Sequence, residues 1–319
     1  MKSTVYRVYR ALPVASIALA LLVQVAVPLS VEQKTAEHPW FTYLLCLSLA
    51  VWAVLLLLQP LLPRLKVSLV SKGPFVAGVA LFFNVVNIFT AKIALFPVLF
   101  FPTLDRVLEN LVADRAFLAK CVLYSLRLLI TGFAIGAAAG FVTGVALGFS
   151  RRFAYWVQPV TRILGPIPTT AWLPLALSSF PTTFAASVFL IAFTVWFQLT
   201  LMTSSGIQGV NKAYFEVAAT LDASSFFQIT RVAIPGAAPT IFLGFFYAVC
   251  SSFIALMTAE MVGTSAGIGW YVHNQKSVMS YAGVYSGLIV IAVLCSLILT
   301  LLFKVRAKIL PWEKGVIKW

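Results

Sequence analysis

Residues 123–149 form the apolar run LYSLRLLITGFAIGAAAGFVTGVALGF, in which Arg127 is the one charged side chain. As a helix, a run of this length can cross the apolar core of a bilayer, which is about 30 Å thick. Glycines recur in it at every fourth position, and this spacing places them in one stripe along the helix. They are Gly132, Gly136, Gly140, Gly144 and Gly148. The stripe predicts a close contact with another helix, either within the chain or as a dimer or sliding surface.

The composition of the whole chain points to the same class of protein. Of the 319 residues, 61% are hydrophobic and 10% are charged, whereas soluble globular proteins carry about 25% charged residues. These values exclude an ordinary soluble enzyme, a disordered protein and a disulfide scaffold. Eight apolar segments are long enough to be transmembrane helices, namely 11–30, 41–59, 75–100, 123–149, 153–180, 183–205, 237–262 and 285–304. The predicted fold is an all-α polytopic membrane protein, with 11–30 retained as a helix; a signal peptide is the alternative.

The net charge of +14 is interpreted as a topology signal, because the basic residues lie in short links between apolar segments. With the N-terminus inside, the cytoplasmic segments carry fifteen Lys and Arg residues and the outer segments carry five. We therefore expect a multi-pass protein of the cell (inner) membrane, with both termini cytoplasmic and no nucleic-acid partner. The cysteines and histidines form no CxxC or clustered pattern, so no metal site is predicted.

The inner link at 206–236 carries the sharpest functional signal. Asn211 can cap a first short helix, the chain should turn near Asp222, and Ser225 should start a second helix with a capping box. Apolar side chains such as Phe226 would face water in this arrangement. Exposed apolar surface of this kind indicates a bound partner; a pair of helices lying on the inner leaflet is the alternative.

The residue pattern of this link resembles that of a known family. Its ExAAxxDA spacing, followed by Arg and Pro, is similar to the EAA loop of ABC-importer permeases, and the stretches 165–175 and 259–271 resemble the nitrate/sulfonate/taurine-type branch. The residues that would form the coupling site are Glu216, Ala218, Ala219, Asp222, Ala223, Phe226, Arg231 and Pro235. Asp222 stands where the family usually has Gly, which is the residue best suited to a left-handed turn after a helix.

The resemblance implies a type I ABC-importer-like permease core at 75–319, with 1–74 forming two additional transmembrane helices. It implies that the loop docks on a dimer of cytoplasmic ATP-binding subunits, so that ATP and Mg²⁺ belong to that partner and this chain is neither an enzyme nor a cofactor carrier. No GxxxxGK[ST] loop for ATP occurs in the sequence. A second permease copy and an extracytoplasmic substrate-binding protein complete the implied assembly, and its cargo would be a small anion of the nitrate, sulfonate or taurine type.

The segment 153–180 contains four prolines and is not expected to form one continuous helix. Broken backbone at membrane depth occurs against protein or beside a water-filled cavity, which favours a place near the translocation path. An interfacial helix before a shorter span is the alternative. The candidate path residues are Ile167, Pro168, Thr169, Thr170, Trp172, Gln198 and Glu260. For Glu260, a structural salt bridge or a cap on neighbouring backbone is the alternative to a place on the path.

Two other functions are alternatives to a transport subunit. A stand-alone secondary transporter or channel would be favoured by inverted repeats with charged residues in the middle of helices, and no such repeats are visible. An intramembrane enzyme would need a cluster such as HExxH or paired carboxylates at depth, whereas the nine acidic residues lie mostly in loops.

Overall fold

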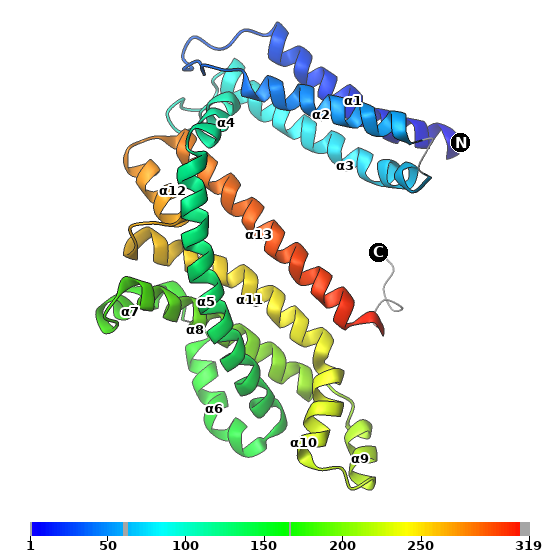
Figure 1. Cartoon of the computed structure of the whole chain (residues 1–319), viewed down its shortest axis with the longest axis vertical. Helices are drawn as coiled ribbons and strands as arrows, with labels where there is room; N and C mark the ends of the chain where they lie inside the picture. The colour runs from blue at the N-terminus through cyan, green and yellow to red at the C-terminus, as the bar shows by residue number, and fades with distance from the viewer. Residues whose placement is uncertain (1, 60–62, 166, 313–319) are drawn as a thin grey trace. The chain divides into compact units, whose positions relative to one another are not determined.

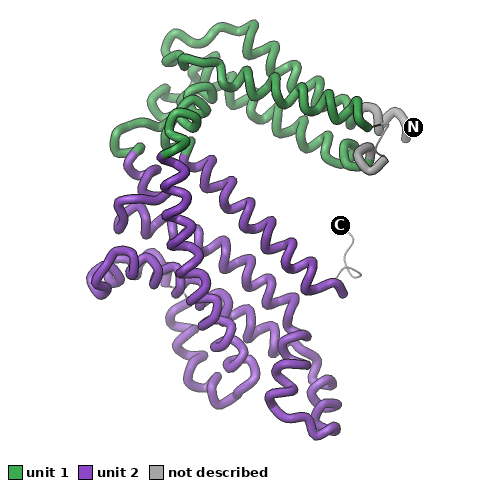
Figure 2. Tube along the Cα trace, viewed as in Figure 1, with its two compact units in different colours: residues 1–116, 275–286 green, residues 117–274, 287–319 purple. Residues whose placement is uncertain are grey.

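The computed structural model describes residues 2–59, 63–165 and 167–312, which form helices and connecting turns without a β-strand. The chain divides into two compact units, residues 1–116 with 275–286 and residues 117–274 with 287–319 (Figures 1 and 2). Among the described residues, seven helices are long and apolar enough to cross a membrane. They are Tyr9–Ala26, Trp40–Leu58, Val67–Lys92, Arg115–Phe149, Thr183–Gln208, Ser225–Gly263 and Tyr281–Ile309.

Unit 1 is built mainly from the N-terminal helices. Its elements are α1 (Lys2–Ala26), α2 (Trp40–Leu58), α3 (Pro63–Asn87), a π-helical turn (Ile88–Lys92) and α4 (Leu104–Ala113). Ile17 of α1 and Phe41 of α2 are buried in its core, and side chains of α3 and α4 pack against them. Asp105 of α4 joins these helices, because its Oδ1 accepts a hydrogen bond of 2.8 Å from the Phe41 N–H and its Oδ2 accepts one of 3.0 Å from Gln24 Nε2.

The limits of unit 1 differ from the division predicted after residue 74. The unit continues through the rest of α3 and through α4 to residue 116. Hydropathy locates each apolar segment but carries no information on which segments pack together.

The third predicted segment, 75–100, ends earlier than predicted: the helix stops at Lys92, and the backbone turns at Ala94 with a φ of 51°.

Unit 2 contains a core formed by α8 and α11. Its elements are α5 (Arg115–Phe149), α6 (Arg151–Leu164), a 3-10 turn (Thr169–Trp172), α7 (Leu173–Ser179), α8 (Thr183–Gln208), α9 (Lys212–Thr220), α10 (Ser225–Phe227), a π-helical stretch (Gln228–Ala233), α11 (Ile234–Gly263), α12 (Ile268–Ser277) and α13 (Tyr281–Ile309). The end of α12 and the start of α13, residues 275–286, belong to unit 1. Leu199 of α8 and Ile241 of α11 are buried against each other, and α5 packs around this cluster. The two helices run antiparallel, since Gly206 lies beside Ala237 whereas Gly244 lies beside Met202.

The glycine stripe of α5 packs against α8. A Cβ atom added at Gly132 would lie 2.7 Å from the Cβ of Ile191. At the other end of the stripe, a Cβ atom at Gly148 would lie 2.8 Å from the Cβ of Ile207, and the three glycines between them meet α8 in the same order. The residue numbers rise together along both helices, so α5 and α8 run parallel. Small residues allow this close approach of two helices, as expected for such a stripe.

Because α5 and α8 run in the same direction, the chain between them has to return from one end of unit 2 to the other. It returns in pieces, as α6, the 3-10 turn and α7, and none of these is among the seven long apolar helices. The predicted span 153–180 is therefore a broken return rather than an eighth continuous helix. Pro159 lies inside α6 and Pro174 lies at the start of α7, whereas Pro166 is outside the described residues.

Candidate functional site

The 206–236 link folds into two short helices separated by a turn, as the sequence indicates (Figure 1). Asn211 caps the first of them, α9, with its Oδ1 accepting a hydrogen bond of 3.0 Å from the Ala213 N–H. At the other end, the Asp222 N–H donates to the Ala219 carbonyl at 3.0 Å, and the Ala223 N–H donates to the Ala218 carbonyl at 3.0 Å. These two bonds form a Schellman motif that ends the helix.

Asp222 occupies the left-handed position of this motif, with a φ of 52°. Gly has the lowest conformational cost at such a position, and Asp is one of the few other residue types found there. The turn therefore forms with the residue that departs from the family pattern, at a local cost in backbone energy.

The second helix, α10, begins at Ser225 as predicted, but its cap lies one residue before the predicted one. Ser224, rather than Ser225, caps it, because the Ser224 Oγ accepts a hydrogen bond of 3.3 Å from the Phe227 N–H. Gln228 donates from its Nε2 to the Ala223 carbonyl at 3.0 Å. The helical path continues through the π-helical stretch into α11, and Pro235 marks the entry into that helix rather than a stop.

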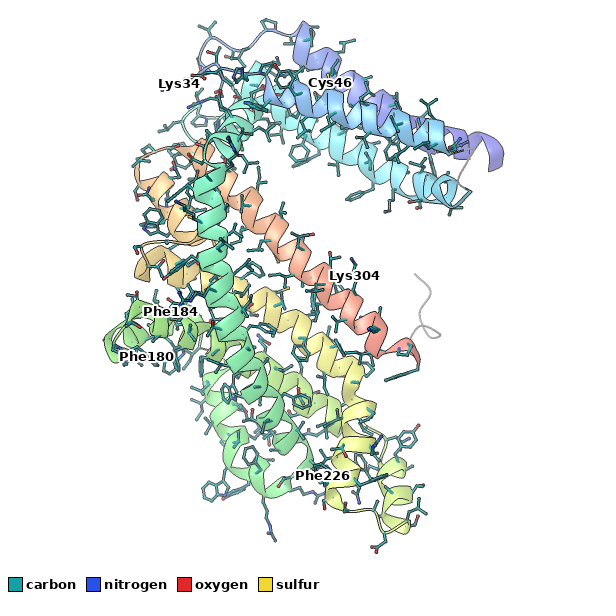
Figure 3. The ribbon with its side chains drawn as sticks, in the orientation of Figure 1. Lys34, Cys46, Phe180, Phe184, Phe226 and Lys304 are labelled. Atoms are coloured by element: carbon teal, nitrogen blue, oxygen red, sulfur yellow. The ribbon has the colours of Figure 1, made fainter. Side chains whose placement is uncertain are left out.

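The surface of α9 and α10 has one covered side and one uncovered side. Phe215 packs towards α5, with its ring centroid 6.3 Å from that of Phe149, and Ala218 is buried. Leu221 is 77% exposed and Phe226 is 76% exposed, and Figure 3 shows Phe226 at the end of unit 2 formed by these short helices. The predicted coupling residues that are exposed with them are Glu216, Ala219, Asp222, Arg231 and Pro235.

Four of the predicted path residues line one pocket of about 200 Å³. Ile167, Pro168 and Thr169 reach it from the turn before α7, and Gln198 reaches it from α8. The other residues that line it are Leu164, Gly165, Phe193, Thr194, Phe197, Ser251 and Ile254. The predicted residues Thr170, Trp172 and Glu260 do not line this pocket.

The sequence analysis missed the aromatic residues of this pocket. Phe193 and Phe197 lie four positions apart on α8, so they share one face of the helix. Phe193 is also stacked against Trp196 and Phe189, with centroid distances of 5.7 and 5.8 Å. The four-residue spacing of aromatics was the available signal, although the same spacing is common in helices whose aromatic face meets lipid or a core.

Glu260 lies away from this pocket and binds backbone instead. The side chain is fully buried, and its Oε2 accepts a hydrogen bond of 2.7 Å from the Gly269 N–H in the first turn of α12. Its Oε1 accepts one of 2.6 Å from the Ser125 hydroxyl. The Ser125 oxygen in turn accepts a bond of 2.9 Å from the Ile268 N–H. This geometry is that of a helix cap, which is one of the structural roles given above as the alternative to a place of Glu260 on the path.

The described residues contain no cluster of three or more His, Cys, Asp or Glu side chains that could hold a metal ion. The features that stand out are therefore a loop with exposed apolar side chains at one end of unit 2 and a partly polar pocket between α8 and the broken return. The loop can bind a partner protein, and the pocket can bind a small molecule.

Comparison with known proteins identifies the family. The family model described as "Binding-protein-dependent transport system inner membrane component" matches residues 132–311. The aliphatic sulfonates transport permease protein SsuC of Bacillus subtilis (strain 168) is 31% identical over 184 residues, which cover 58% of this chain and 67% of that protein. The nitrate import permease protein NrtB of Leptolyngbya laminosa is 27% identical over 190 residues, which cover 60% of this chain and 68% of that protein.

A solved structure shares the fold. A chain of the MetNI methionine ABC transporter, in inward-facing conformations, aligns with a TM-score of 0.53 at 16% identity, covering 62% of this chain and 98% of that chain. The sequence relatives confirm the resemblance to ABC-importer permeases, and the match to residues 132–311 covers most of unit 2. The chain belongs to the family of binding-protein-dependent transport system inner membrane components.

Proposed function

We propose that the chain is the membrane-spanning subunit of an ATP-driven importer and that α9 couples it to a separate dimer of cytoplasmic ATP-binding subunits. The observation that carries this proposal is the two-sided surface of the loop. Phe215 seats α9 on the end of α5, whereas Leu221 and Phe226 are left uncovered. An exposed apolar surface beside charged groups such as Glu216 fits a protein partner.

The connections of the loop explain how docking could move the membrane helices. α9 packs on α5 through the Phe149–Phe215 ring pair, and α10 continues through Gln228–Ala233 into α11. A displacement of the docked loop would therefore be passed to both helices. In this proposal ATP and Mg²⁺ bind to the partner. The difference in free energy between the open and closed states of the partner drives the permease between its inward-facing and outward-facing states.

For the cargo we propose a small anion, which an extracytoplasmic substrate-binding protein delivers to a pair of permease copies. The relatives named above are permeases for aliphatic sulfonates and for nitrate. Aliphatic sulfonates and nitrate are both anions with a compact oxygen-bearing group. We further propose that both termini lie on the cytoplasmic side together with the 206–236 loop. This orientation is supported by the excess of basic residues in the links on that side.

The substitution Glu216→Lys tests the coupling role, because Glu216 is exposed on α9 and contributes nothing to the caps of that helix. In proteoliposomes that contain the full transporter and its binding protein, the variant should lose uptake and substrate-stimulated ATP hydrolysis by roughly tenfold or more. Glu32→Lys makes the same charge change at an exposed residue between α1 and α2, and it should leave both rates unchanged. Normal substrate-stimulated hydrolysis in Glu216→Lys would contradict the proposed role.

A stand-alone secondary transporter predicts a different result in the same vesicles. Uptake would then continue after ATP is exhausted, provided that a proton gradient remains. Our proposal predicts that uptake stops under these conditions and returns when ATP is supplied on the side of the 206–236 loop.

A further inference from the structure

A second and larger pocket, of about 450 Å³, lies next to the pocket of the predicted path residues. Gly165 and Phe197 line both pockets. A Cβ atom at Gly165 would lie 2.9 Å from Cζ of Phe197, so the ring of Phe197 packs directly on this glycine where the two pockets meet. The polar side chains that line the second pocket are Gln158, Thr161, Arg162, Ser204, Ser205 and Gln208.

Arg162 is an exposed residue of α6 in unit 2. It is in the last turn of α6, about 16 Å along the helix axis from Arg151 by the rise of an α-helix. Phe197, which meets the next turn at Gly165, is near the middle of α8. From this level the pocket follows α8 down to Gln208, at the end where α9 begins. A cation is costly where it faces lipid, so a cation on a membrane-spanning unit is expected to be paired or to face a cavity.

The guanidinium of Arg162 has no partner among the described residues, whereas two basic side chains of the membrane-spanning helices, Arg127 and Lys92, each have one. Arg127 lies over the ring of Phe184 at 4.9 Å, and Lys92 donates from Nζ to the Gln24 carbonyl at 2.9 Å. No acidic side chain lines the second pocket, and no ion pair or hydrogen bond of Arg162 is found in the described part of the chain. The pocket therefore presents one uncompensated positive charge among hydroxyl and amide groups.

We propose that this pocket is a transit site for the anionic cargo, in which Arg162 binds the oxyanion group. The inference rests on the proposed import function and adds a specificity-determining residue to it. A guanidinium binds planar or tetrahedral oxyanions through two parallel N–H donors. Gln158 and Gln208 carry amide donors, and Ser204 and Ser205 carry hydroxyl donors for the remaining oxygens.

The single cation suits a transport step. One charged contact surrounded by neutral donors favours an anion over an uncharged molecule, and it still allows release, which strong binding by several cations would slow. Phe197 lines both pockets, so cargo that passes from the pocket of the predicted path residues into the Arg162 pocket would pass Phe197. The pocket of the predicted path residues and the Arg162 pocket thus form two successive sites along α8.

The headgroup of an anionic lipid is the other anion that could reach Arg162 from the bilayer, so the test separates free anion from anionic lipid. The full transporter is placed in nanodiscs of phosphatidylcholine alone, without nucleotide, and its arginines are modified with phenylglyoxal. Peptide mass spectrometry then follows Arg162 and, as a matched control, Arg152, which is exposed at the other end of the same helix. Methanesulfonate is the probe anion, and methanol at the same concentration is its uncharged counterpart.

We expect methanesulfonate, but not methanol, to slow the modification of Arg162 by roughly tenfold at saturation and to leave Arg152 unchanged. Equal modification of Arg162 with and without methanesulfonate would overturn the proposal. So would protection that appears only when phosphatidylglycerol is added, since the site would then be one for the headgroup of an anionic lipid. The measurement requires no ATP, so a failure of the coupling role of α9 would leave it unaffected.

A pair of variants connects the site to transport. Arg162→Gln should lower uptake by roughly tenfold or more, because the charged contact to the anion is lost. Arg162→Lys retains the charge and should recover part of the rate, and Arg152→Gln should transport normally. Normal uptake by a folded Arg162→Gln transporter would reject a role for this residue in passage of the cargo.

Discussion

The carboxylate of Glu260 and the hydroxyl of Ser125 are joined by a hydrogen bond of 2.6 Å, although the two residues are far apart along the chain. Glu260 belongs to α11 and Ser125 to α5, and together they hold the first turn of α12 through the Gly269 and Ile268 N–H groups. Three helices therefore meet at one fully buried acidic side chain. This arrangement gives Glu260 a structural task that does not require contact with cargo.

Replacing Glu260 by Ala should lower the free energy of unfolding by about 1–3 kcal/mol, because the Gly269 N–H would lose its buried acceptor. The expected result is a lower midpoint of thermal unfolding for the detergent-solubilised protein. Thr258→Ala is the matched control, since Thr258 is only partly buried on the same helix and its hydroxyl bonds to a carbonyl within that helix, and it should unfold close to the native midpoint. An unchanged midpoint for Glu260→Ala together with lost uptake would instead place Glu260 on the path.

Asp222→Gly should stabilise the end of α9. The residue adopts a φ of 52°, where Gly avoids a local cost of about 1 kcal/mol. Hydrogen exchange of the Asp222 and Ala223 amides, which close the Schellman motif, should slow by roughly fivefold. Asp222→Val should have the opposite effect, because a β-branched residue is disfavoured at positive φ. Faster exchange in the Gly variant would show that this turn is not formed in solution.

Gly140→Ala should weaken the contact between α5 and α8. The added Cβ atom would lie 2.8 Å from the Trp196 carbonyl oxygen, and relief of such a clash by a backbone shift costs about 1–3 kcal/mol. A lower unfolding midpoint is expected. Gly78→Ala is the control, because a Cβ atom there would meet nothing within 4 Å; this change should be neutral or slightly stabilising, since Ala favours helix. Equal midpoints for both variants would contradict the close packing of the stripe.

Local rules predicted the loop of unit 2 well. Asn211 caps α9 as expected, and the turn falls at Asp222, because capping and turn preferences depend on residues a few positions apart. The same rules misplaced the second cap by one residue, since Ser224 and Ser225 are chemically equivalent and only the geometry after the turn selects Ser224. The role of the loop in coupling stays a prediction.

The grouping of the candidate path residues was predicted in part, and their role in a path stays a prediction. Proline content placed Ile167 to Thr169 in a broken segment, and these residues do share a pocket with Gln198. The prediction included Glu260 in the same group because an acid within an apolar segment indicates function, whereas its partners show a cap. It left out Phe193, Phe197 and the Arg162 pocket, because a single sequence does not reveal which face of α8 meets α6.

The sequence by itself determined that this chain crosses a membrane as helices and that a capped loop of family type connects two of them. Both properties follow from apolar length and from contacts between near neighbours in the chain. Only the tertiary structure decided that α5 and α8 run parallel, that 153–180 is a broken return, and that Arg162 faces a pocket without an acidic partner. These are relations between residues distant in sequence, and they depend on how side-chain volumes pack, which hydropathy and capping rules do not encode.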